Sequence, residues 1–98
     1  MFSGLKSLET LILTRNPIAF ISPKTFSVMV SLRELAVNKG KLALIRPGAF
    51  DGLVSLESLN LNDNAITELP NKLFAGLRAL RKVYNTSVPS LDIFRRCL

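Results

Sequence analysis

Residue types that carry enzymatic or metal chemistry are sparse in this chain. It has no histidine, so the commonest acid/base catalyst and metal ligand is absent, and its one cysteine, Cys97, cannot form a disulfide within the chain. The acidic residues are scattered among different segments, and neither a Gly-rich phosphate loop nor a nucleophile elbow is present. We therefore expect no enzyme, no metal site and no cofactor.

Three asparagines at alternate positions, Asn60, Asn62 and Asn64, resemble the opening of a calcium-binding loop. The rest of that pattern is missing, because the loop needs a glycine at its sharp turn and a bidentate glutamate at its close, where Asn71 stands instead. We interpret the first two as outward strand residues and Asn64 as a turn residue.

Basic side chains are concentrated at one end. Residues 1–68 hold seven basic and six acidic side chains, whereas residues 69–98 hold six and one. Such an end could attract an acidic protein, a sulphated glycan or a lipid head group, although a solvated end is the commoner outcome. No nucleic-acid-binding motif accompanies the charge, so nucleic acid is not an expected partner. The six basic residues are Lys72, Arg78, Arg81, Lys82, Arg95 and Arg96.

The elements that position these residues follow from an internal repeat of 24 residues. Phe2, Phe26, Phe50 and Phe74 share this spacing, and so do Leu8, Leu32, Leu56 and Leu80. Within each repeat, six apolar positions recur in the same order, as a stacked repeat architecture requires. The aligned sets are Leu8, Leu11, Leu13, Ile18, Ile21 and Phe26; Leu32, Leu35, Val37, Leu42, Ile45 and Phe50; Leu56, Leu59, Leu61, Ile66, Leu69 and Phe74.

The segments LETLILTRNPI and LESLNLNDNAI match the pattern L-x-x-L-x-L-x-x-N-x-L, and LRELAVNKGKL departs from it only at Gly40. The chain thus resembles the leucine-rich-repeat family, and its repeat length resembles that of extracellular proteins and receptor ectodomains. The resemblance implies an α/β solenoid, a right-handed superhelix with a short-stranded parallel sheet on its concave face. The repeats then cover residues 1–83, with a partial repeat at 1–7, full repeats at 8–31, 32–55 and 56–79, and the start of a fourth at 80; residues 84–98 form an irregular C-terminal segment.

The alternation of apolar and polar residues places the strands. Successive side chains of a strand point to opposite faces, so strands centred near Leu11 to Leu13, Leu35 to Val37 and Leu59 to Leu61 bury their leucines. Asn16 and Asn64 follow where the chain turns away, and a short amide there can satisfy backbone groups that would otherwise be buried unpaired. Gly40 lacks that amide, so the second repeat should hold a weaker rung, and Gly40→Asn should be neutral or stabilising. The returns should be irregular or short helices that carry the phenylalanines.

The outward strand residues form the candidate contact surface, because in this family the concave sheet is the usual binding face. We expect a protein-recognition module from an extracellular matrix protein or a receptor ectodomain. Binding of a matrix component or sulphated glycan through the basic end, and an intracellular scaffold, remain alternatives. The expected contact residues are Thr10, Ile12, Thr14, Glu34, Ala36, Asn38, Ser58, Asn60, Asn62, Lys82 and Tyr84.

The two ends carry weaker signals. Neither a secretory signal peptide nor a membrane-spanning run occurs in the sequence, and we expect a fragment of a longer solenoid. Asn85-Thr86-Ser87 is an N-glycosylation sequon, which gives weak support for a secreted or cell-surface origin. The N-terminal face should stay exposed and favour self-association, whereas Val83, Val88, Leu91, Ile93 and Phe94 should cover the other end.

Overall fold

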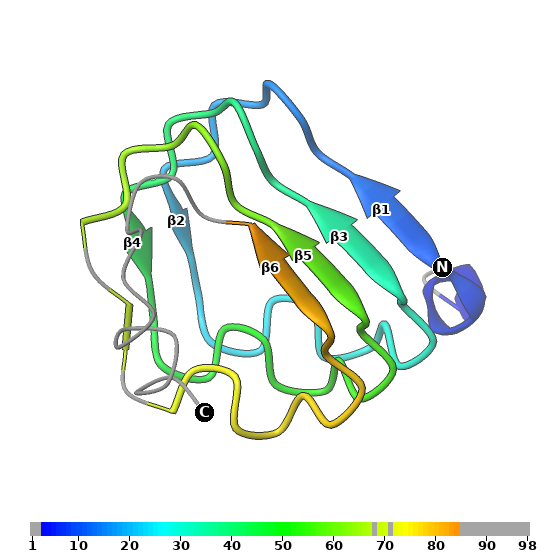
Figure 1. The fold of residues 1–98 in the computed structure, drawn as a ribbon. Coiled ribbons are helices and arrows are strands. Elements are labelled where there is room, and N and C mark those ends of the chain that lie inside the picture. The colour runs from blue at the N-terminus through cyan, green and yellow to red at the C-terminus, as the bar shows by residue number, and fades with distance from the viewer. Residues whose placement is uncertain (1–2, 68, 71, 85–98) are drawn as a thin grey trace.

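A parallel sheet with one strand from each repeat forms one side of the molecule (Figure 1). The computed structural model describes residues 3–67, 69–70 and 72–84. The strands are β1 (Thr10–Ile12), β3 (Glu34–Ala36), β5 (Ser58–Asn60) and β6 (Lys82–Tyr84), in the order β1-β3-β5-β6. Each residue pairs with the one 24 positions further along, as Leu11 does with Leu35 and Leu35 with Leu59. The predicted parallel stack is confirmed, although each strand is centred one residue earlier than the sequence suggested.

The return segments are built from turns and not from α-helices. Two short strands, β2 (Phe20–Ile21) and β4 (Leu44–Ile45), pair in a second parallel sheet. Among the described residues the only helical element is the 3-10 helix η1 (Ser3–Ser7). The helical part of the expected α/β architecture is therefore wrong for this part of the chain. Pro23 and Pro47 begin the turns, and Lys24 and Gly48 after them have positive φ, 59° and 81°, which ends any right-handed helix.

Leucines and phenylalanines of successive repeats fill the space between the two sheets. Leu32, Leu56 and Leu59 are fully buried. Phe26, Phe50 and Phe74 form a continuous stack, with ring centroids 6.2 Å apart at both steps. Among the described residues no polar or charged side chain is buried. The predicted interior is confirmed, and its stability rests on contacts between neighbouring repeats.

The Asn64 side chain ties two repeats together, as the sequence predicted for this position. Its Oδ1 accepts hydrogen bonds from the backbone N–H groups of Gly40 and Leu42, at 3.1 and 3.2 Å. Its Nδ2 donates to the carbonyls of Val37 and Leu61, at 2.7 and 3.1 Å, and also to that of Asn62. Three of these five bonds reach the preceding repeat. One amide thereby satisfies backbone groups on both sides of a turn.

An asparagine at position 40 could not take the same role, because its side chain would clash with neighbouring atoms. A Cβ added to Gly40 would lie 2.6 Å from the backbone oxygen of Asn16 and 3.2 Å from Oδ1 of Asn64. The expectation that Gly40→Asn is neutral or stabilising is therefore wrong for this backbone. Positive φ is not the reason, because Gly40 does not have it. Asn16 occupies the same repeat position as Asn64 but is exposed. Asn64 bonds backbone groups of the preceding repeat, whereas β1 is the first strand of the described sheet, so Asn16 has no preceding strand there to bond.

The first rung of the stack is less buried than those after it. Leu8, Leu11 and Leu13 are partly exposed, whereas their counterparts Leu32 and Leu35 are 0% and 2% exposed. The N-terminal face, which was expected to stay exposed, is therefore partly exposed in the described part of the chain. Of the expected C-terminal cover, Val83 is part of β6, where it pairs with Leu59 and packs against the core. The other residues of the cover and Cys97 lie outside the described residues. No helix in the described part of the chain is long and apolar enough to cross a membrane.

Candidate partner-binding surface

An open groove of about 630 Å³ crosses all four strands of the larger sheet. Its walls are mainly polar and charged, and they come from two adjacent positions of every repeat, with Tyr84 at one end. A groove to which every strand contributes side chains can hold a ligand, and polar groups on a rigid scaffold fix the orientation of that ligand. The lining residues are Glu9, Thr10, Arg33, Glu34, Glu57, Ser58, Arg81, Lys82 and Tyr84.

The first of the two positions forms a column of alternating charge, which we call the charge column: Glu9, Arg33, Glu57 and Arg81. Backbone hydrogen bonds hold its members in line. The N–H of Arg33 donates to the carbonyl of Glu9 at 2.7 Å, and the next two steps, Glu57 to Arg33 and Arg81 to Glu57, are both 2.8 Å. The column is thus an extension of the sheet, one residue ahead of the strands.

Arg33 lies at the centre of this electrostatic network. Its Nε donates to Oε2 of Glu57 at 2.7 Å, and its Nη1 lies 3.9 Å from Oε1 of Glu9. The hydrogen bond from Arg33 lowers the pKa of Glu57, with a smaller charge contribution from Arg33 and Arg81. The same bond raises the pKa of Arg33. Arg33 and Glu9 are exposed and Glu57 is partly exposed, so the pairing organises the surface more than it stabilises the fold.

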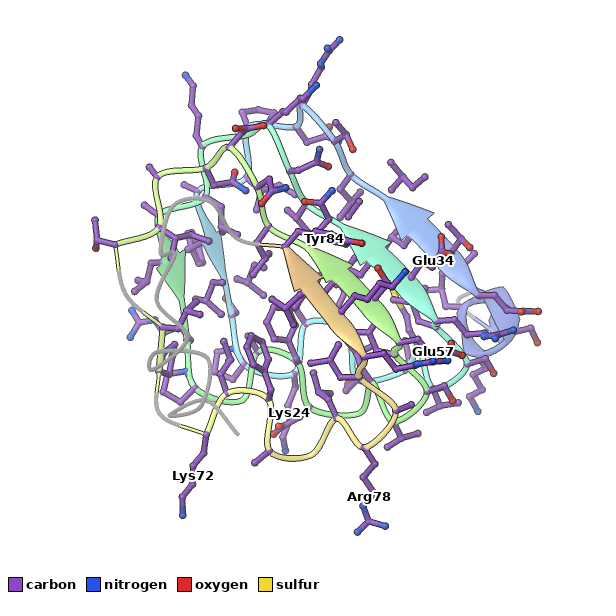
Figure 2. The ribbon with its side chains drawn as sticks, viewed as in Figure 1. Lys24, Glu34, Glu57, Lys72, Arg78 and Tyr84 are labelled. Atoms are coloured by element: carbon purple, nitrogen blue, oxygen red, sulfur yellow. The ribbon has the colours of Figure 1, made fainter. Side chains whose placement is uncertain are left out.

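Several predicted contact residues line this groove or lie beside it. Thr10, Glu34, Ser58, Lys82 and Tyr84 form its second wall and its end. Ile12, Ala36 and Asn60 occupy the next outward position along their strands, where Asn60 is aligned with Tyr84 in the sheet register. Ile12 and Tyr84 are 65% and 44% exposed, so the face carries two large side chains without a core role. Figure 2 shows Tyr84 on β6.

Three further predicted residues lie beyond the strand ends and form internal hydrogen bonds. Thr14 Oγ1 donates to Oδ1 of Asn38 at 2.7 Å. The backbone N–H of Asn62 donates to Oδ1 of Asn60 at 3.0 Å. These polar groups connect or brace neighbouring strand ends, which leaves them less hydrogen-bonding capacity for a partner.

Sequence reasoning missed the charge column. Along the sequence Glu9 and Glu57 look scattered, and Arg33 belongs to no motif. The signal is present in the 24-residue register, where glutamate and arginine alternate at one position over four repeats. The alternation of apolar and polar residues within the strands does not include these four residues, because each lies one residue before its strand.

The basic residues that the sequence grouped together are separated in space. Arg81 and Lys82 lie in the groove, whereas Lys72 and Arg78 point away from the molecule at the edge below the strands (Figure 2). Arg95, Arg96 and the sequon residue Asn85 lie outside the described residues. No group of three potential metal ligands occurs in the described part of the chain.

Comparison with known proteins gives one clear match. The family model described as "Leucine rich repeat" matches residues 1–42 and 30–84. These ranges contain all four rungs of the larger sheet and the whole charge column. No curated protein matches the chain significantly.

Proposed function

Because this chain belongs to the leucine-rich-repeat family, whose repeats generally mediate interactions between proteins, we propose that it is a protein-recognition module and not an enzyme. Its partner binds across the outward face of the larger sheet. The observation that carries this proposal is the open groove, because all four strands contribute exposed or partly exposed polar side chains to it. Side chains with no core role are free to serve recognition.

Rigidity of the face supports the same function. The residues beneath it, such as Leu35 and Leu59, are at most 2% exposed, and the strands above them are tied by backbone hydrogen bonds. A surface that is already ordered loses less conformational entropy when a partner binds. The face therefore suits a partner that docks on a preformed surface.

The curvature of the stack supports assignment of this face to the concave side. Neighbouring strands in a sheet are about 4.8 Å apart, whereas the phenylalanine rings behind it are 6.2 Å apart. When the spacing between repeats is larger on the phenylalanine side than on the strand side, the stack curves so that the sheet lies on its concave side. The difference is small, so four rungs form a shallow surface that leaves room for a broad partner.

Crosslinking from defined positions tests the contact face. A photoreactive phenylalanine analogue placed at Ala36 in the face should crosslink to a protein partner in cells that express the chain. The same analogue at Lys72 is the matched control, because that side chain points away from the molecule. Tyr84→Ala should weaken the Ala36 crosslink. Equal crosslinking from both positions would contradict the proposal.

We further propose that the module belongs to an extracellular matrix protein or a receptor ectodomain. The 24-residue repeat and the sequon at Asn85 support this location. Surface biotinylation of intact cells, with a glycosidase mobility shift that Asn85→Gln abolishes, checks it. Retention on a heparin column that Lys72→Glu and Arg78→Glu remove would instead favour binding of sulphated glycans through the basic end.

A further inference from the structure

The charge column has alternating signs that make it complementary to its own reversed order, a property that binding a different protein does not require. Along the stack its signs run negative, positive, negative, positive. Reading the column from the other end inverts every sign, so the first position is opposite in charge to the fourth, and the second to the third. A surface with this order is complementary to a reversed copy of itself.

A twofold axis parallel to the strands produces that reversal. It turns one sheet face onto another, keeps equivalent strand positions level and reverses the order of the rungs. Glu9 of one protomer then faces Arg81 of its partner, and Arg33 faces Glu57. In an isologous interface each contact occurs twice, so the column forms four opposite-charge pairs and no like-charge pair.

The apolar side chains of the face follow the same operation. Ile12 on the first rung meets Tyr84 on the fourth rung of the partner copy. These are the two large exposed apolar side chains on the outward face of the larger sheet, at 65% and 44% exposure, and each is the third residue of its strand. The pairing therefore covers exposed apolar area at both ends while it matches charge along the column.

We propose, building on the proposed function, that one partner of this face is a second copy of the chain, docked face to face about a twofold axis parallel to the strands. Four strands span only about 14 Å at 4.8 Å spacing. The contact is thus smaller than the roughly 800 Å² per partner of a standard interface. The dimer is therefore expected to be weak, and its charge pairs make it sensitive to salt.

The pair Glu9 and Arg81 provides a test that separates contacts between copies from contacts within one. These residues lie on the first and last rungs, about 14 Å apart by strand spacing, too far for a direct contact within a chain. Each of Glu9→Arg and Arg81→Glu places like charges opposite each other across the interface. Each variant alone should raise the dimer Kd about tenfold or more, an order of magnitude expected for close interfacial charges.

Combining the two charge reversals should restore dimerisation. The double variant E9R/R81E should dimerise like the wild type, and an equimolar mixture of the two single variants should form a heterodimer. Sedimentation equilibrium over a concentration series up to about 1 mM, at low and high salt, measures both. Lys72→Glu and Arg78→Glu are control charge reversals outside the face and should leave the Kd unchanged. Circular dichroism melts verify that every variant is folded.

The self-pairing would be overturned by a wild-type chain that stays monomeric throughout the series, or by a double variant that dimerises no better than the single ones. Association that persists in high salt and ignores both reversals would assign it to the exposed N-terminal leucines instead, and would also overturn it. The proposed function is decided separately by the crosslinks from Ala36, because a monomeric chain can still bind a different protein there.

Discussion

At the scale of single residues, a one-position difference separates structural from surface roles. Leu59 is fully buried, whereas its neighbour Asn60 lies partly exposed on the outer face. Leu59→Ala should lower the free energy of unfolding by about 2 to 5 kcal/mol, the range for truncation of a buried leucine. Asn60→Ala should cost about 1 kcal/mol, because it removes the acceptor for the Asn62 N–H. Chemical denaturation compares them, and equal losses would contradict the assignment of faces.

Asn64 should be far more important to stability than Asn16, although both occupy the same position of the repeat. Asn64→Ala removes five hydrogen bonds and leaves backbone groups of Val37, Gly40 and Leu42 without this partner. The expected loss is about 2 to 4 kcal/mol, since each unsatisfied group costs about 1 to 3. Asn16→Ala should change stability by less than about 0.5 kcal/mol. Urea denaturation checks the pair, and comparable losses would show that the inter-repeat bonds are unimportant.

Gly40→Asn should be destabilising, by about 1 to 3 kcal/mol, because the added Cβ would lie 2.6 Å from the carbonyl oxygen of Asn16 and force the turn to shift. Gly76→Asn is the matched control, since nothing lies within 4 Å of a Cβ there. Thermal melts of both variants measure the difference. A melting temperature of Gly40→Asn at or above that of the wild type would mean that the turn relaxes to accept the amide.

At the scale of elements, the charge column links strands through an ion pair with a defined pH response. The folded pKa of Glu57 is depressed, so its pairing with Arg33 contributes stability above the ordinary glutamate pKa of about 4.3 and loses it as pH falls through the folded value. Carbon NMR titration should show Arg33→Gln raising the pKa of Glu57, whereas Arg46→Gln should leave it unchanged. An unaltered pKa in Arg33→Gln would mean that the hydrogen bond does not persist in solution.

The elements also show what sequence reasoning can reach. The positions of the strands and the phenylalanine stack follow from the 24-residue sequence repeat, because the buried residues recur with that same period. β2 and β4 were not predicted, since two-residue strands arise from the stacking of returns and leave no alternation of their own. The effect of Gly40 depends on one interatomic distance, which no residue pattern encodes. The charge column was visible in the register and needed only a comparison of charges between repeats.

At the scale of the whole molecule, stability should vary from rung to rung. The amides of Leu13 and Val37 both donate to the next strand, at 2.7 and 2.9 Å, so they differ mainly in the burial of their rungs. Leu13 is partly exposed and Val37 is 2% exposed. Native-state hydrogen exchange should show the Leu13 amide exchanging about tenfold faster or more, because the outer rung opens locally. Equal protection would show that all rungs open as one cooperative unit.

The alternation within the charge column also bears on how such a chain can lengthen. Glutamate recurs only at every second rung, from Glu9 to Glu57, and the turn position likewise alternates between Asn16, Gly40 and Asn64. Duplication of one 24-residue repeat would preserve the strand register but place like charges on adjacent rungs. Duplication of two repeats would preserve both. The unit that can be copied without damage to this surface is therefore the pair of repeats, and inheritance in pairs would keep the surface self-complementary as the array grew.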